Sequence, residues 1–292
     1  MSLIHVVVLA IVQGLAELLP VSSSAHVVVA EKLMGLDPSA PAFTLLLVLL
    51  HTGTMFAVIA YFWRQWLLTY FASREAFLRF ATHVVIATAL TGIIGYGLGK
   101  LVVRVVFPGS AHADIEELFS HLELIAPALF AVGILIIVAD LRERRAARRS
   151  PEKFRPRGAM SVDQSAAIGV AQGLALPFRG FSRSGATIST GMLAGVEKVT
   201  AEAFSFALAV VLTPPVVGRE LLRLYKQRAS LPPGTLQSDL ELSVLGGLLA
   251  FIAGLIALKW LSAWLERGRW VYFGVYCLIA AAVVAALHFE GL

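Results

Sequence analysis

The chain has 292 residues, of which 58% are hydrophobic and 15% charged, and its mean hydropathy is +0.80. These values exclude an ordinary water-soluble globular protein and indicate a polytopic membrane protein. The net charge of +5 does not indicate nucleic-acid binding, because much of the basic excess lies in one short segment without interleaved aromatic residues.

The first unusual stretch runs from Val12 to His26. It places Glu17, the serines Ser22 to Ser24 and His26 inside an apolar run that is too short for an unbroken membrane span of about 20 residues. Polar groups at membrane depth are costly and usually functional. This stretch is therefore the first candidate for a site.

The same stretch predicts two short helices. Residues 3–19 predict an apolar helix that ends before Pro20, because proline lacks an N–H and disfavours a helical residue before it. The serines then offer N-cap oxygens to a second helix over about 25–34. Two half-length helices around a polar turn predict a re-entrant hairpin inside the bundle, since irregular backbone at membrane depth must be shielded from lipid.

A second hairpin is expected later in the chain. A short apolar helix over 161–176 is broken at Pro177 to Gly185, and another short helix follows over about 186–196. The fold expected is an all-α polytopic membrane protein with about six transmembrane helices and two re-entrant helix-loop-helix hairpins. The six spans are predicted at about 42–63, 82–106, 121–141, 200–220, 242–263 and 270–289.

Charge predicts the orientation. Residues 142–157 carry eight basic and two acidic residues, so the positive-inside rule makes this loop cytoplasmic. The loop at 64–80 is then also cytoplasmic, and the loop at 107–120 and both termini lie outside. Four basic residues strain this assignment, because they fall in a loop that it makes external: Arg219, Arg223, Lys226 and Arg228.

An internal repeat relates the two hairpins. Gln-Gly-Leu-Ala occurs at 13–16 and again at 172–175, each time before a proline, a serine-bearing loop and a short helix. The first hairpin would enter from outside and the second from the cytoplasm, so the two halves would have inverted topology. We expect a single integral membrane domain, residues 1–292, with repeats over about 1–141 and 160–292 and a cytoplasmic basic loop at 142–159.

The charged residues of the hairpins need partners. Gln13 and Glu17 are four residues apart and share one helix face. A charged residue at the centre of a membrane helix costs about 2.5–3.5 kcal/mol even on lenient scales, so Glu17 requires a partner, for which Arg183 is the candidate. Such a pair could merely lock the hairpins together, or it could belong to a reactive site.

Both predicted hairpins place hydroxyl groups and a basic residue where a helix starts. Free backbone N–H groups and the positive end of the helix dipole favour anions there, and an arginine fork suits phosphate oxygens. The alternative is that the serines cap helices and the histidine packs. The candidate anion-binding residues are Ser22, Ser23, Ser24 and His26 in the first hairpin, and Ser182, Arg183, Ser184 and Thr187 in the second.

These residues resemble the undecaprenyl-diphosphatase (bacitracin-resistance) family over essentially the whole chain. Its first motif is matched from Gln13 through Glu17 and Pro20-Val-Ser-Ser to His26, and its second from Ser182 to Ser189. The segment 202–206 also matches. The chain departs from the family where Gln13 replaces a glutamate, where Ala25 replaces a glycine, and where Arg179 precedes the second motif.

The resemblance implies an activity. A member of this family removes one phosphate from undecaprenyl diphosphate, which leaves the monophosphate lipid carrier for cell-wall assembly. It also implies the bacterial inner membrane, a site open to the periplasm, a polyprenyl diphosphate lipid substrate, and a divalent cation, Mg²⁺ or Ca²⁺, with Glu17 as the metal-binding residue. The sequence leaves a monomer or a homodimer open.

Phosphoryl transfer needs an in-line nucleophile and neutralisation of charge on the phosphate oxygens. In our hypothesis Arg183 holds the terminal phosphate, Ser23 attacks, and His26 is the general base or acid. His26 could instead be the nucleophile. Glu17 would orient His26 or hold the metal, with Gln13 and Arg179 in support.

Two other functions remain open. Inverted repeats with broken helices also describe secondary transporters, so the chain could be a transporter or flippase of a polyprenyl phosphate or another anion. It could also be a structural partner in a cell-wall complex. The Ser23–His26 pair beside Arg183 favours hydrolysis, because transport of an anion does not need it.

The remaining histidines receive no catalytic role. His51 lies in the first full span, where hydrogen bonding between helices is favoured over lining a cavity. His112 and His121 flank the acidic external loop and are expected to be solvated.

Overall fold

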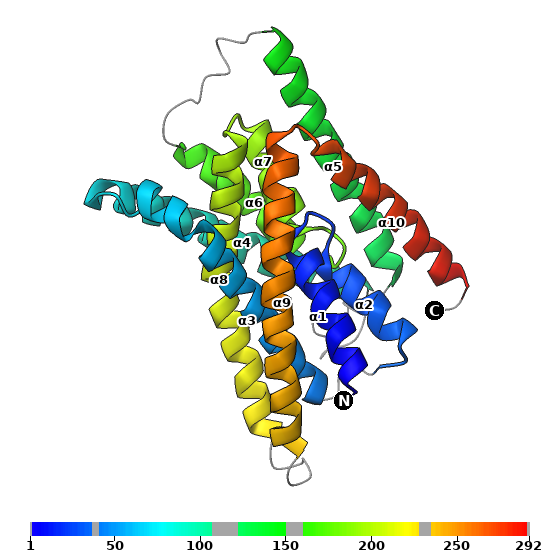
Figure 1. The fold of residues 1–292 in the computed structure, drawn as a ribbon. Helices are drawn as coiled ribbons and strands as arrows, with labels where there is room; N and C mark the ends of the chain where they lie inside the picture. Colours follow the sequence, from blue (N-terminus) through cyan, green and yellow to red (C-terminus); the bar gives the residue numbers. More distant parts are fainter. Residues whose placement is uncertain (1, 37–40, 107–121, 150–159, 228–234, 291–292) are drawn as a thin grey trace. The chain divides into compact units, whose positions relative to one another are not determined.

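The computed structural model describes residues 2–36, 41–106, 122–149, 160–227 and 235–290 (Figure 1). Within them the chain forms helices α1 to α10 and no strand, which confirms the all-α prediction. The bounds are α1 Leu3–Leu18, α2 Ser23–Leu33, α3 Pro41–Thr69, α4 Arg74–Val106, α5 Leu122–Arg149, α6 Val162–Ala175, α7 Arg183–Leu193, α8 Lys198–Gln227, α9 Thr235–Glu266 and α10 Val271–Phe289.

Two pairs of short helices alternate with longer helices along the described chain. Among the described residues, α1 and α2 have 16 and 11 residues, and α6 and α7 have 14 and 11. Each short pair precedes three longer helices, and the 6 described helices that are long and apolar enough to cross a membrane are α3, α4, α5, α8, α9 and α10. The number of spans is as predicted, while re-entrance of the short pairs and inversion of the halves stay predictions.

Local chemistry sets the ends of the short helices. The Ser2 hydroxyl caps α1 by accepting the His5 N–H at 3.4 Å, and α1 ends two residues before Pro20, as expected. A capping box starts α6: Ser161 accepts from the Gln164 backbone, and the Gln164 side chain accepts from the Ser161 backbone. Local residues therefore account for both ends of α1 and for the start of α6.

Several long helices extend beyond the predicted spans. The predicted basic loop at 142–157 is helical through Arg149 in α5, and α8 continues through Gln227. Arg219, Arg223 and Lys226 therefore belong to a helix and not to a loop. Arginine and lysine are good helix formers, so charge ends a membrane span without ending the helix. The predicted loop at 107–120 and the part of the predicted loop at 142–159 that follows Arg149 lie outside the described residues. His112, His121 and Arg228 lie outside them as well.

The chain divides into two compact units. The first unit comprises Met1–Leu19, Ser23–Arg64 and Ala209–Leu261; the second comprises Pro20–Ser22, Gln65–Leu208 and Ser262–Leu292. Each unit draws on both halves of the sequence, so the units do not coincide with the predicted repeats. The predicted single domain stays a prediction.

The first unit is held together by α1, α2, α3 and α9. Gly53 of α3 lies so close to α9 that an added Cβ would stand 2.1 Å from the Gly247 carbonyl oxygen. Gly14 of α1 is similarly close to Ala250 and Ala253 of α9. The buried cluster of this unit consists of Val6, Leu9, Ala10, Val27, Phe43, Leu46, Leu50 and Ala250.

Gly53→Ala should destabilise the protein despite the better helix propensity of alanine. The added methyl group meets backbone, so the helices must separate, at a cost of about 1–3 kcal/mol. Gly97→Ala is the matched control, because no atom lies within 4 Å of its added Cβ and the change should stabilise by up to about 1 kcal/mol. Melting temperatures in detergent should move in opposite directions. An unchanged or raised melting temperature for Gly53→Ala would contradict the close contact of α3 with α9.

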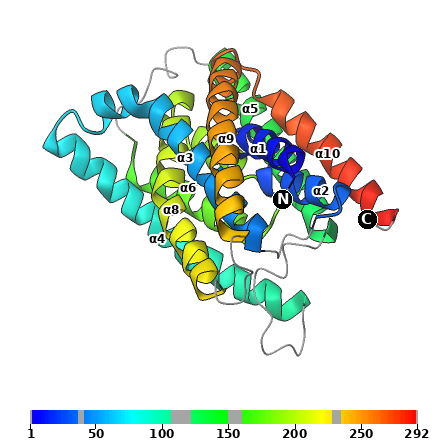
Figure 2. The ribbon, with the colours of Figure 1, turned by 60° about the horizontal axis from the view of Figure 1, so that its bottom comes forward.

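The second unit contains two helix pairs. In α4 and α6, a Cβ added to Gly169 would lie 2.5 Å from the Ala87 carbonyl oxygen, and the Thr91 hydroxyl donates to the Gly169 carbonyl at 3.0 Å. In α5 and α10, Gly133 and Gly274 face each other at similarly short range. The pair α5 and α10 lies side by side in both views (Figure 1 and Figure 2).

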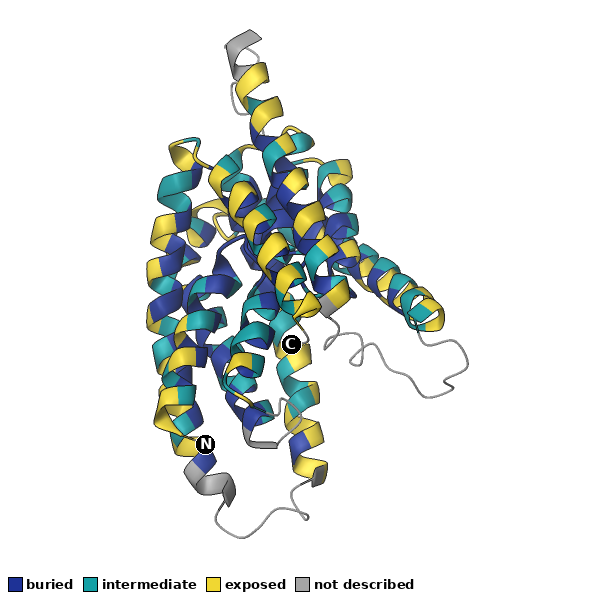
Figure 3. Ribbon diagram, turned by 90° about the vertical axis from the view of Figure 1, so that its right-hand side faces the viewer, coloured by how far each residue is buried: buried dark blue, intermediate teal, exposed yellow. Residues whose placement is uncertain are grey.

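Stripes of exposed residues follow the long helices (Figure 3). Many are large and apolar: Ile93 is 69% exposed, Val105 71% and Leu222 63%. Exposed apolar surface on this scale is unfavourable in water and favourable against lipid tails. The surface therefore agrees with the composition, and the protein is a multi-pass membrane protein.

Candidate active site

Two candidate residues, Gln13 and Ser23, donate hydrogen bonds to one carboxylate oxygen of a third, Glu17. The Ser23 hydroxyl donates to Glu17 Oε2 at 2.6 Å, and the Gln13 side-chain amide donates to the same oxygen at 3.1 Å. Gln13 is 1% exposed and the Glu17 side chain 14% exposed. Gln13 and Glu17 share one face of α1, as their spacing predicts, and the start of α2 brings Ser23 against that face.

His51 of α3 also faces this carboxylate. Its Nε2 lies 3.9 Å from Glu17 Oε2, and its Nδ1 hydrogen-bonds the Leu47 carbonyl oxygen at 2.8 Å, one turn earlier in the same helix. With Nδ1–H donating to a carbonyl, a neutral ring presents an unprotonated Nε2 toward Glu17. The sequence predicts a hydrogen bond from His51 to a neighbouring helix, whereas this hydrogen bond stays within α3. A lone histidine in an apolar span carried no sequence signal for this position beside Glu17.

The turn before α2 has an unusual backbone. Ser22 has φ of 68°, in the left-handed region that residues other than glycine rarely adopt. The Cys277 thiol donates to the carbonyl oxygen of Pro20 at 3.3 Å in the same turn. Strained backbone of this kind concentrates at functional sites. Ser24 and His26 follow in the first turns of α2, where both are partly buried.

The strain at Ser22 can be measured with a matched pair of variants. Ser22→Ala and Ser22→Gly both remove the hydroxyl, but only glycine relieves the left-handed backbone. The glycine variant should therefore be more stable than the alanine variant by about 1 kcal/mol or somewhat more. Melting temperatures in detergent test this, and equal stability of the two variants would show that Ser22 does not hold this conformation.

The second group lies at the start of α7. Ser182 is the N-cap: its hydroxyl accepts the Gly185 N–H at 3.2 Å and lies 3.3 Å from the Ser184 hydroxyl. Arg183 is the first residue of α7 and is partly buried. The hydroxyls of Ser182 and Ser184 therefore lie beside the backbone N–H groups of this first turn, which also contains Arg183. Binding of an anion here stays a prediction.

Thr187 and Ser189 are fully buried within the second unit. The Thr187 hydroxyl donates to the Arg183 carbonyl oxygen at 2.8 Å and is hydrogen-bonded to the Ser205 hydroxyl of α8. Ser189 accepts from the indole of Trp270 at 3.1 Å. These bonds fix α7 against its neighbours. A role of Thr187 in binding phosphate stays a prediction.

The loop between α6 and α7 is shaped by Gly180. Its φ is 107°, and an added Cβ would lie 2.5 Å from the Ile125 carbonyl oxygen, so glycine is required there. Arg179 precedes it and is partly buried. Gly180 thus allows the backbone turn that connects Arg179 to the N-cap at Ser182. The sequence identifies Arg179 as a candidate residue, but it does not predict this close approach of Gly180 to α5.

The two groups belong to different compact units. Glu17, Ser23 and His26 lie in the first unit, and Arg183 lies in the second. The prediction that Arg183 confronts Glu17 and His26 across one pocket therefore stays a prediction. Within the first unit Ser23 is hydrogen-bonded to Glu17, and within the second unit Ser182 caps the start of α7.

Glu17 is the one carboxylate among the candidate residues of this site. No group of three or more His, Cys, Asp or Glu side chains that could hold a metal occurs among the described residues. Mg²⁺ is commonly held by one or two carboxylates together with substrate phosphates. A single carboxylate at the end of α1 fits that arrangement.

The family model described as bacitracin resistance protein BacA matches residues 6–283. This chain belongs to that family. An undecaprenyl-diphosphatase 2 of Acinetobacter baylyi is 53% identical over 290 residues, which cover 98% of each chain. An undecaprenyl-diphosphatase 2 of Burkholderia ambifaria is 35% identical over 291 residues, which cover 96% of this chain and 95% of that relative. This confirms the family indicated by the two motifs.

Proposed function

We propose that this member of the BacA family is an undecaprenyl-diphosphatase. It hydrolyses undecaprenyl diphosphate to undecaprenyl phosphate and inorganic phosphate, and so recycles the lipid carrier for peptidoglycan synthesis. The similarity to relatives named undecaprenyl-diphosphatase supports this substrate. The capped, arginine-bearing start of α7 supports the binding of a phosphate group.

One observation carries the reaction type: the hydrogen bond from the Ser23 hydroxyl to Glu17 at 2.6 Å. A serine is a weak nucleophile unless a base takes its proton as it attacks. Glu17 is placed to take that proton, and Gln13 and His51 surround the same oxygen. Transport of an intact anion does not require a serine that is hydrogen-bonded to a base.

The first step transfers the terminal phosphoryl group. Ser23 Oγ bonds to the terminal phosphorus, its proton passes to Glu17, and the bond from phosphorus to the bridging oxygen breaks. Undecaprenyl phosphate leaves with the bridging oxygen. Arg183 and the first N–H groups of α7 neutralise charge on the equatorial oxygens, which is the main protein contribution in phosphoryl transfer.

The second step releases phosphate. Water attacks the phosphoserine, and a base takes the proton of that water while Ser23 Oγ leaves and recovers a proton. His26 lies three residues after Ser23 on the same face of α2 and can exchange protons with the leaving oxygen or the water. The competing assignment makes His26 the nucleophile through a phosphohistidine.

A divalent cation, Mg²⁺ or Ca²⁺, would be held by Glu17 together with the diphosphate. When bound, it would neutralise charge on the diphosphate oxygens. We place the site on the periplasmic side of the inner membrane, with both termini on that side and the basic end of α5 in the cytoplasm. Ser22, Ser24, Ser182 and Ser184 would provide further hydroxyls around the phosphate.

Release of phosphate from undecaprenyl diphosphate by the purified protein in detergent tests this function. Hydrolysis needs no second compartment, whereas transport does. We expect multiple turnovers in micelles, with turnover reduced when a chelator removes divalent cations. A protein that binds the lipid in micelles but releases no phosphate would contradict the proposal and favour a carrier.

A further inference from the structure

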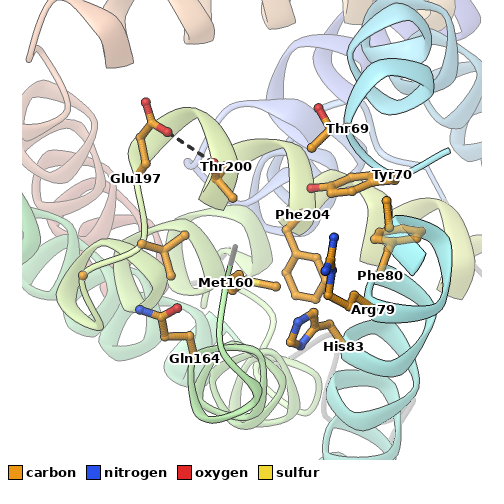
Figure 4. A pocket seen from close by; sticks show the side chains of 13 residues that line it. Thr69, Tyr70, Arg79, Phe80, His83, Met160, Gln164, Glu197, Thr200 and Phe204 are labelled. Atoms are coloured by element: carbon orange, nitrogen blue, oxygen red, sulfur yellow. Dashed lines mark hydrogen bonds between the residues drawn. The ribbon is translucent and has the colours of Figure 1, made fainter. Parts of the chain in front are cut away.

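A pocket of about 310 Å³ lies in the second unit, where several helices end or begin (Figure 4). Its lining includes Thr69 at the end of α3 and Tyr70 just after it, residues of the first turns of α4, and residues at the starts of α6 and α8. Small-molecule sites have volumes from about 300 Å³ upward, so this pocket is large enough for a compact polar group. None of the candidate catalytic residues lines it.

Part of the pocket lining is aromatic. Tyr70 stacks on Phe80 with ring centroids 4.1 Å apart, and Phe80 meets Phe204 edge to face at 6.5 Å. His83 also lines the pocket, and its Nδ1 is hydrogen-bonded to the Ser165 hydroxyl at 3.0 Å. Burial raises the pKa of the Tyr70 hydroxyl. Ring contacts and a hydrogen bond therefore fix several of the side chains that line this pocket.

Opposite charges stand on opposite sides of this pocket. Figure 4 shows Arg79 beside Phe80 and His83, and Glu197 with Thr200 on the facing side. Glu197 accepts from the Thr200 hydroxyl at 3.5 Å, and Arg79 forms no ion pair with any residue that the structure describes. Both residues are exposed, and both line the pocket. A ligand that satisfies both must carry a negative and a positive group.

The surroundings indicate a lipid. The pocket lies where the apolar part of α3 ends at Thr69 and that of α4 begins, which is the depth at which lipid head groups meet protein. Beside it, Phe71 and Leu78 are 50% and 52% exposed, and Phe77 is 44% exposed. These side chains can cover acyl chains, while the charged pair remains for the head group.

We propose that this pocket binds the head group of a zwitterionic phospholipid of the phosphoethanolamine class. Its phosphate binds Arg79, its ammonium group binds Glu197, and its acyl chains lie against Phe71 and Phe77. A polyprenyl phosphate, which carries only negative charge, would leave Glu197 opposed by phosphate. The site is separate from the reaction centre, so its failure would leave the proposed hydrolysis untouched.

Native mass spectrometry of the purified full-length protein tests this site. Dioleoyl phosphatidylethanolamine and dioleoyl phosphatidylglycerol are added at equal concentration, and retained lipid is counted. We expect the zwitterionic lipid to be retained at least about threefold more than the anionic one. Arg79→Gln should lower retention of both by about tenfold, because it removes a charge-assisted hydrogen bond to phosphate.

Glu197→Gln should lower retention of phosphatidylethanolamine alone and so remove the preference. Arg74→Gln and Glu75→Gln are the matched controls, since both residues are exposed at the start of α4 and neither lines the pocket. Both controls should retain lipid as the wild type does. The proposal is overturned if Arg79→Gln behaves like Arg74→Gln, if the preference survives in Glu197→Gln, or if undecaprenyl phosphate displaces phosphatidylethanolamine from the wild type at equal concentration.

Discussion

Arg183→Ala is expected to lower kcat/KM for phosphate release by at least about a hundredfold, because the charge that develops on the transferring phosphoryl group loses its guanidinium partner. Arg183→Lys should recover part of the loss, since lysine restores charge without the bidentate fork. The measurement is phosphate release in detergent at saturating and limiting substrate.

Arg104→Ala is the control for this prediction. Arg104 is exposed in the last turn of α4, in the same unit as Arg183, and should be replaceable with little effect on turnover. Both variants should melt close to the wild type. Full activity in the folded Arg183→Ala variant would refute the role of α7 in holding phosphate.

Ser23→Ala and Glu17→Gln are each expected to reduce kcat by at least about a hundredfold, as loss of a nucleophile or its base usually does. Because Ser23 donates directly to Glu17, the two should act as a unit. The double variant should then lose about as much as the worse single variant, and not the product of the two losses. Multiplicative losses would mean that Glu17 acts elsewhere, for example on His26 or a cation alone.

A chemical quench separates the two nucleophiles. Labelled phosphate trapped on the enzyme should survive acid if it is on Ser23 and should survive only alkaline conditions if it is on His26. We expect the acid-stable species in the wild type and its absence in Ser23→Ala. An acid-labile label that persists in Ser23→Ala would assign the attack to His26.

Most helices could be predicted from the sequence because their signals are local. Pro20, the serine caps and unbroken apolar runs have the same meaning in any fold, and the structure confirms the short helices and the long spans. Helix ends in polar sequence could not be placed, since the basic residues after position 141 are compatible with both a loop and a helix outside the lipid.

The contacts of the site were less predictable because they join distant residues. The face shared by Gln13 and Glu17 followed from spacing alone. The hydrogen bond from Ser23 to Glu17 depends on the turn at Ser22. The left-handed backbone of that turn could not be predicted, because serine rarely adopts it. The approach of His51 depends on packing between α1 and α3, which hydropathy does not encode.

Binding of orthovanadate, a mimic of the phosphoryl-transfer transition state, tests the central claim most directly. In an experimental structure of the vanadate complex, we predict vanadium bonded to Ser23 Oγ, with Arg183 and the first N–H groups of α7 donating to its equatorial oxygens. Vanadate bound by only one of the two helix starts, or Arg183 turned toward lipid in that complex, would contradict a reaction centre built from both.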